Sequence, residues 1–154
     1  MFSDTLERMK IEIDQSGKIE DTNRDTVIAY ANGQSRSIII TGKTKRRLQE
    51  TYRQTGQPRL FVIKTFSVAI FLLVKSDLRK LSEIVIDEEY SGHESVIEAT
   101  LKELFGDQHD PSVVFHRIGK GSKAHDLALK VFQGKIRADE RLNFDKIYRY
   151  CLKI

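Results

Sequence analysis

Three aspartates stand where apolar runs of this chain end or a helix is expected to begin, and their carboxylates are the first candidates for chemistry. Asp14 closes the alternating run Met9–Asp14, and a Gln-Ser-Gly turn follows it. Asp87 closes the short apolar run Glu83–Asp87, and Asp126 lies in the first turn of the last expected helix. Carboxylate oxygens are hard ligands that suit Mg²⁺ and Mn²⁺. A fold that brought the three acids together would give them a catalytic and metal-binding role.

Each aspartate also has a purely local explanation. Asp is a favoured turn residue, so Asp14 can simply begin the turn that contains Gly17. Asp87 opens a run of three acids, in which Glu88 is its substitute as a ligand, and such runs are usually solvated loops. The dipole of a helix stabilises an acid in its first turn, as at Asp126, without any ligand role. The residues alone leave both interpretations open.

The elements that must position these acids are read from the hydrophobic periodicity. Met9–Asp14 alternates like a half-buried strand, and the β-branched runs on either side of Asn32-Gly33 predict a hairpin after it. Two more strands are expected, at Glu83–Asp87 and Val113–Ile118. The expected helices are Lys43–Arg53, Leu60–Leu78, a segment from a Ser91/Glu94 capping box to Gly106, and Lys123–Gln133 with Ser122 as its N-cap.

The resulting order is β-β-β-α-β-α-β-α, which predicts an α/β fold. The first three strands form an antiparallel meander, and the alternation of strands and helices that follows implies right-handed crossovers and parallel pairing. Leu60–Leu78 is apolar nearly all round, so we expect a helix packed on several sides. The chain is interpreted as one domain, 1–154, with a core at 9–134 and a weakly helical tail at 135–154.

This element order, together with the Asp-Gln-Ser-Gly turn, the acid that ends the fourth strand and the Asp that enters the last helix, resembles the ribonuclease H-like superfamily over about residues 9–134. The resemblance implies a five-stranded mixed sheet, in which the first strand is central and the fourth lies parallel beside it. It also implies that Asp14 and Asp87 face each other while Asp126 approaches from the final helix. Neighbouring strands lie about 4.8 Å apart, so these carboxylates would need Mg²⁺ or Mn²⁺ between them.

Metal ions held in this way activate water and stabilise the leaving oxygen of a phosphodiester. The expected function is therefore metal-dependent hydrolysis of nucleic acid, by a nuclease or an enzyme similar to Holliday-junction resolvases. The alternative is a non-catalytic module of the same fold that binds nucleic acid or a protein. A third interpretation, half of an actin-like or sugar-kinase-like protein, shares the Asp and Gly near the first strand but is usually far longer.

Basic residues form two clusters that suit a polyanion. One lies on the first expected helix and includes Lys45, and the other surrounds the last turn, where Gly119 and Gly121 leave the backbone free to approach phosphate. Glu50 stands near the place where some ribonucleases of the superfamily have a fourth acid, and His125 is a possible proton shuttle. The candidate nucleic-acid-binding residues are Lys43, Arg46, Arg47, Lys120 and Lys123.

Composition excludes several other classes. With 154 residues, a net charge of +4 and one cysteine, Cys151, the chain has the size of one domain and cannot form an internal disulfide, which favours a cytoplasmic location. The histidines lack zinc-ligand spacing, and no nucleophile elbow or dinucleotide motif is present.

No secretory signal is expected in Met1–Lys10. The apolar stretch Leu60–Val74 is shorter than the roughly 20 residues needed to cross a bilayer, so no membrane partner is expected.

Overall fold

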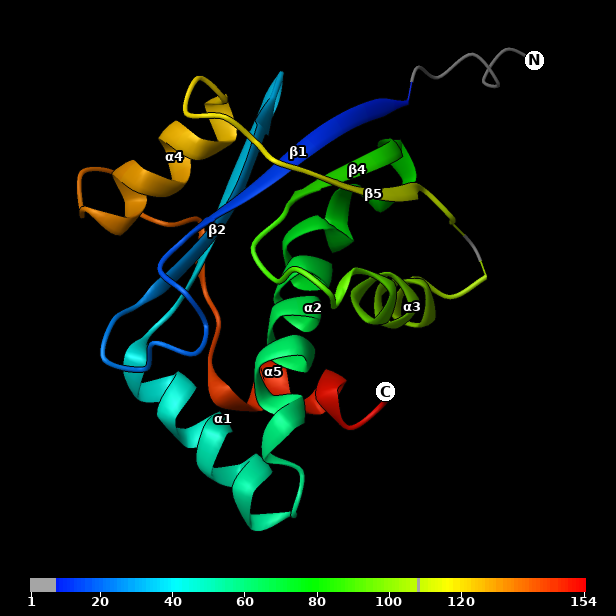
Figure 1. Cartoon of the computed structure of the whole chain (residues 1–154). Coiled ribbons are helices and arrows are strands. Elements are labelled where there is room, and N and C mark those ends of the chain that lie inside the picture. Colours follow the sequence, from blue (N-terminus) through cyan, green and yellow to red (C-terminus); the bar gives the residue numbers. More distant parts are fainter. Residues whose placement is uncertain (1–7, 108) are drawn as a thin grey trace.

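A six-stranded mixed sheet forms the centre of the part of the chain that the computed structural model describes, residues 8–107 and 109–154 (Figure 1). Its strands are β1 Met9–Ser16, β2 Thr26–Asn32, β3 Gln34–Ile40, β4 Leu81–Asp87, β5 Ser112–His116 and β6 Glu140–Arg141, in the order β5-β4-β1-β2-β3-β6. β1, β2 and β3 form an antiparallel meander, while β4 lies parallel to β1 and β5 parallel to β4. The prediction that the first and fourth strands are adjacent and parallel is confirmed. Residues 1–7, where no secretory signal is expected, lie outside the described residues.

The sheet has one strand more than the five predicted. The additional strand, β6, has two residues and lies parallel to β3, and the backbone N–H of Leu142 beside it donates to the carbonyl of Ile39 at 3.0 Å. Arg36 on β3 also contacts Glu140, with 2.8 Å between Nη2 and Oε1. Two residues are too few to show the alternation that identifies a strand, so periodicity could not find β6.

Helices cover both faces of the sheet (Figure 1). The α-helices are α1 Gly42–Gln54, α2 Phe61–Val74, α3 Glu94–Phe105, α4 Lys123–Phe132 and α5 Phe144–Cys151, and Pro58–Leu60 and Lys75–Lys80 form short 3₁₀ helices. Twelve of the fourteen residues of α2 are buried, which confirms the predicted helix packed on several sides. α1, α3 and α5 contact α2 on one side of the sheet, while α4 packs against β1 and β2 on the other. None of the helices in the described residues is long and apolar enough to span a membrane.

The C-terminal segment 135–154 packs against the main core. The side chain of Asn143 caps α5 by accepting from the backbone N–H of Lys146 at 2.8 Å. Leu142, Ile147 and Cys151 are buried and belong to the same apolar cluster as α2. The segment that was expected to be a tail therefore contributes to the core.

Of the two helix caps that the sequence predicts, one is confirmed and one is wrong. Ser122 caps α4 as predicted, because its Oγ accepts from two backbone N–H groups of the first turn at 3.1 and 3.3 Å. The predicted capping box of Ser91 and Glu94 is wrong, since α3 begins at Glu94 itself. The Glu94 carboxylate instead accepts from the backbone N–H of Gly92, at 2.8 Å, and holds the turn that precedes the helix.

The ammonium group of Lys45 ties α1 to the loop between β1 and β2. Lys45 is fully buried, and its Nζ donates to the carbonyls of Lys18 and Asp21, at 3.0 and 2.7 Å, and to Thr26 Oγ1 at 2.9 Å. Its three N–H donors are thus all used. Burial lowers the pKa of Lys45 to about 8. The negative charges of Asp21 and of two further acids in the loop oppose this decrease. Lys45 therefore serves the fold, although the sequence groups it with surface basic residues.

We predict that Lys45→Met destabilises the protein by about 3 kcal/mol, because it leaves three acceptors, of which Thr26 Oγ1 is buried, without their donor. Lys43→Met is the matched control, since Lys43 is an exposed residue of the same helix, and it should change the free energy of unfolding by less than about 0.5 kcal/mol. Urea denaturation measures both. Equal stability of the two variants would contradict a structural role for the buried ammonium group.

Candidate functional site

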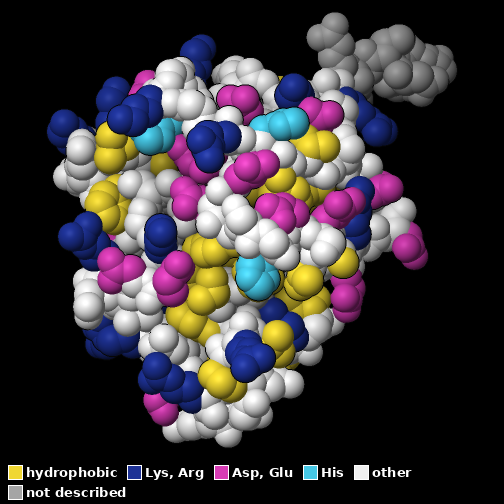
Figure 2. All heavy atoms as spheres, viewed as in Figure 1, with side chains coloured by type: hydrophobic (Ala, Val, Ile, Leu, Met, Phe, Trp, Pro, Cys, Tyr) yellow, Lys and Arg dark blue, Asp and Glu magenta, His cyan; other side chains and the backbone are white. Residues whose placement is uncertain are grey.

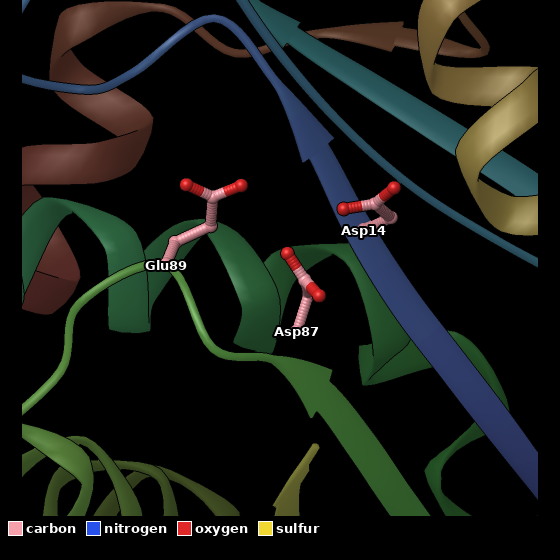
Figure 3. Close-up of side chains that lie close together, drawn as sticks. All are labelled: Asp14, Asp87 and Glu89. Carbon is pink, nitrogen blue, oxygen red and sulfur yellow. The ribbon is translucent and has the colours of Figure 1, made fainter. Parts of the chain in front are cut away.

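Three carboxylates meet where two neighbouring strands end (Figure 3). Asp14 lies on β1, Asp87 is the last residue of β4, and Glu89 follows two residues later. One oxygen from each lies within 4.8 Å of the oxygens of the other two. Asp14 is buried and the other two are half-buried, so this group of acids is partly withdrawn from water.

The register of the parallel pair explains how Asp14 and Asp87 meet. Ile13 on β1 lies opposite Ile86 on β4, and both side chains belong to the core around α2. Successive side chains of a strand point to opposite faces, so the next residue on each strand turns away from that core. The two carboxylates therefore emerge side by side on the face of the sheet where α4 packs.

Asp14 is held by two hydrogen-bonding partners. Its Oδ1 accepts from the backbone N–H of Gln15 at 2.8 Å, and its Oδ2 lies 2.8 Å from Nδ1 of His125 on α4. Burial raises the pKa of this carboxyl above its ordinary value, while the contacts with His125 and Gln15 oppose the rise. A neutral His125 that donates from Nδ1 keeps Nε2 as an acceptor, and about a third of the side chain is exposed.

Glu89 lies beside Asp87, and the two carboxyl groups repel each other when both are ionised. The Oδ1 of Asp87 accepts from the backbone N–H of Ile118 at 2.6 Å, which ties the loop after β5 to the site. Burial raises the pKa of Glu89 to about 7, with further contributions from the charge of Asp87 and a hydrogen bond to it, while Lys18 opposes the shift. Glu89 is therefore close to half-protonated near neutral pH.

Tyr90 fixes the turn that follows β1. Its hydroxyl accepts from Nε2 of Gln15 and from the backbone N–H of Ile19, both at 3.1 Å. Gly17 in this turn has φ +83°, and a Cβ placed there would lie 2.2 Å from the carbonyl oxygen of Asp25. Because no other residue fits at that position, the turn after Asp14 is defined by glycine on one side and by Tyr90 on the other.

The arrangement suits one kind of ligand in particular. Carboxylates this close repel one another unless a proton or a cation lies between them, and their oxygens suit Mg²⁺ or Mn²⁺. No protein-family model, curated protein or solved structure matches this chain. The chemistry of the site is therefore inferred from its own residues.

The structure brings together two of the three predicted acids. Asp14 and Asp87 belong to the group, whereas the side chain of Asp126 is exposed and lies outside it. Successive residues of a helix are about 100° apart, so once His125 faces Asp14 its neighbour turns towards solvent. Glu50 and Glu88, the other acids considered, are also exposed and outside the group.

Glu89 is the member of the site that sequence reasoning missed. In the sequence it stands only as the last acid of the run that begins at Asp87. Period-two alternation through this run would have placed Asp87 and Glu89 on one side and Glu88 on the other. That signal was present, but it continues beyond the end of β4 into a loop, where strand periodicity is not normally applied.

The predicted nucleic-acid-binding residues lie in two separate places. Arg46 donates to the carbonyl of Thr22 at 2.6 Å, and the guanidinium of Arg47 lies 3.9 Å from the centre of the Phe144 ring. These two side chains therefore already have contacts within the fold. The remaining three make no ion pair within the described part of the chain and are exposed, and they are Lys43, Lys120 and Lys123.

We predict that, without added metal, the protein loses stability as the pH rises from about 4.5 to about 7. The pKa of Glu89 is about 7 in the fold and 4.5 ordinarily, so the folded state binds more protons across this window. The contribution of Glu89 is fully present below pH 4.5 and is lost above pH 7. Melting temperatures across this pH range measure the effect.

Glu89→Gln should flatten this pH dependence and raise the melting temperature at pH 8, because it removes one of the repelling charges. Glu88→Gln is the matched control, since Glu88 is the exposed neighbour outside the group. A pH profile of Glu89→Gln that coincides with that of Glu88→Gln would exclude the electrostatic conflict.

Proposed function

We propose that this protein is a divalent-metal-dependent phosphodiester hydrolase that acts on nucleic acid and has a ribonuclease H-like fold. The observation that carries the proposal is the meeting of Asp14, Asp87 and Glu89 at the ends of adjacent parallel strands. Acids in such a place repel one another and are maintained at a cost in stability. A bound divalent cation would offset this repulsion and would explain why the three carboxylates lie together.

The order of the strands supports the ribonuclease H-like part of the proposal. The sequence resemblance implies a central first strand with the fourth parallel beside it, and β1 and β4 have this relation. β5 extends the sheet on the same side, and β2 and β3 form the antiparallel meander on the other. β6 is an addition at the far edge, away from the carboxylates.

The three carboxylates would hold the metal. Mg²⁺ or Mn²⁺ bound there would supply an activated water and stabilise developing negative charge on the phosphodiester. Glu89 is poised for this role, because a group with a pKa near 7 releases its proton readily when a cation arrives. Asp14 and Asp87 each use one oxygen for a backbone N–H, which fixes their side chains in advance.

His125 has a positioning role towards Asp14 and a possible role towards substrate. Its Nδ1 lies against Asp14 Oδ2 and orients that carboxylate, as a histidine partner commonly does beside a metal ligand. Its Nε2 has no hydrogen-bond partner in the described residues. In the protonated form, this nitrogen could give a proton to the leaving oxygen.

The charge around the site supports a polyanionic substrate. Figure 2 shows acidic side chains grouped near the middle of one face, with Lys and Arg side chains along the margin over α4. Lys120 precedes α4 and Lys123 is its first residue, so both are close along the chain to His125. These lysines are exposed and suited to neutralising phosphates.

The alternative of a non-catalytic binding module has one observation in its favour. Asp14 and Asp87 each accept a hydrogen bond from a backbone N–H, at 2.8 and 2.6 Å, so both also have a structural use. In that interpretation the acids shape the turn after β1 and the loop after β5. The response to metal decides between the two functions.

We predict that Asp14→Asn abolishes metal-dependent phosphodiester cleavage and leaves the fold intact. Asn keeps a carbonyl oxygen for the Gln15 N–H and removes one of the repelling charges, so the melting temperature without metal should stay the same or rise. In the unchanged protein, Mn²⁺ should raise the melting temperature, and in Asp14→Asn it should not. Cleavage is measured on labelled single-stranded, duplex, hybrid and branched substrates.

Asp126→Asn, which changes an exposed acid outside the group, is the matched control and should retain most of the response to Mn²⁺. If Mn²⁺ leaves the melting temperature of the unchanged protein where it was and no substrate is cut, the hydrolase is excluded and the binding module replaces it.

We predict that affinity for nucleic acid falls steeply with salt, because binding depends on phosphate neutralisation. Lys120→Gln with Lys123→Gln should weaken binding and reduce the slope of log K against log salt by about one for each phosphate that is no longer neutralised. Arg79→Gln is the control, since Arg79 is exposed on the 3₁₀ helix Lys75–Lys80 and lies outside both basic clusters. Binding that ignores salt in a fluorescence titration would contradict this.

A further inference from the structure

A second site lies at the other end of α4 from His125. There the loop after α4 returns to β6 and borders an open cavity of about 570 Å³. Between His125 and Val131 the helix rises by roughly 9 Å, so the cavity and the carboxylate group are separate. The lining residues that matter for recognition are Ile39, Val131, Ile136, Arg137, Asp139 and Arg141.

One part of this cavity is apolar. Ile39 comes from β3 and Val131 from α4, and Ile136 closes the cavity from the loop between α4 and β6. Ile136 keeps 42% of its surface exposed, which is unusual for a side chain of its size. Sites for small molecules are usually concave, of roughly 300–1,000 Å³. This cavity has a volume in that range and combines an apolar side with charged side chains.

Two arginines supply positive charge at the same cavity. Arg137 and Arg141 both line it, and both are exposed. Neither guanidinium makes an ion pair or a hydrogen bond with any described residue, in contrast to Arg36, which is paired with Glu140. A guanidinium presents a planar fork of donors that fits the oxygens of phosphate. Two unpaired forks at one cavity favour a phosphorylated ligand.

Asp139 offers a hydrogen-bond acceptor at the same cavity, which a ligand without N–H or O–H donors cannot use. Its Oδ2 accepts from the backbone N–H of Ser37 at 2.8 Å, which anchors the carboxylate beside β3. Its Oδ1 accepts no hydrogen bond within the described residues. This oxygen can accept from an N–H group of a ligand. A suitable ligand therefore combines a phosphate, a flat apolar surface and N–H donors.

We infer that this cavity binds a nucleotide. Its phosphate lies between Arg137 and Arg141, its base lies against Ile39, Val131 and Ile136, and N–H groups of the base face Asp139. The inference does not depend on metal binding by the carboxylate group.

Isothermal titration with the four ribonucleoside monophosphates, the matching nucleosides and inorganic phosphate tests this inference. At least one monophosphate should bind more tightly than its nucleoside and more tightly than inorganic phosphate, because both the base and the phosphate contribute. The double variant Arg137→Gln with Arg141→Gln should lose roughly tenfold or more in affinity, since each charge-assisted hydrogen bond to phosphate is strong.

Lys130→Gln with Lys135→Gln is the matched control, because it removes the same charge from exposed residues that do not line the cavity. It should keep the affinity within about twofold. Asp14→Asn should also bind normally, so a failure of the proposed hydrolase and a failure of the nucleotide site are distinguishable.

Three results would overturn the inference. These are the absence of binding by every monophosphate at millimolar concentration, binding of inorganic phosphate as tight as that of every monophosphate, and an equally large decrease in affinity in the lysine control. Circular dichroism of each variant confirms that the fold is retained, so weaker binding can be attributed to the cavity.

Discussion

In the parallel pair of β1 and β4, Ile13 lies opposite Ile86, and this register decides both what is buried and what is available for chemistry. It places the two isoleucines in the core around α2 and the following acids on the opposite face. A shift by one residue would exchange these roles, because side chains alternate along a strand. The driving force that buries the core therefore also holds two carboxylates together against their repulsion.

The fold limits the cost of that repulsion in several ways. One oxygen of Asp14 and one of Asp87 accept from backbone N–H groups, which compensates part of the lost hydration. His125 faces Asp14, and Glu89 can keep its proton up to about neutral pH. Tyr90 and Gly17 define the turn after β1, so Asp14 is held at a turn with little freedom to rearrange.

The elements that the sequence predicts correctly are those whose pattern extends over several residues. Features that depend on one or two residues are predicted less well. The strand Met9–Asp14, the hairpin at Asn32-Gly33 and the apolar helix of α2 repeat over several residues, and all three are found in the structure. β6 has only two residues, and the capping box depended on a helix boundary that lies two residues later than expected, with His93 as the N-cap in place of Ser91. Such features are set by tertiary contacts that no local pattern contains.

The same distinction applies to the site. Asp14 and Asp87 were predicted because each closes an apolar run in a chain that resembles the ribonuclease H-like superfamily. Glu89 lies in a loop, and His125 was considered only as a proton shuttle or a contact to phosphate. The direction of a side chain on α4 depends on how the helix docks, and this decided between His125 and Asp126. Lys45 was grouped with basic residues of the surface, but it is buried under the loop that it holds and has a structural role.

The hydrogen bonds of the Lys45 ammonium group also determine where the chain can change in length. Surface loops usually accept insertions and deletions. The β1–β2 loop is different, because the carbonyls of Lys18 and Asp21 must reach one ammonium group together with Thr26. An added residue between Lys18 and Asp21 would move one of these acceptors out of reach. Variation in length should therefore be confined to other connections, and this loop should keep a constant number of residues even where its side chains differ.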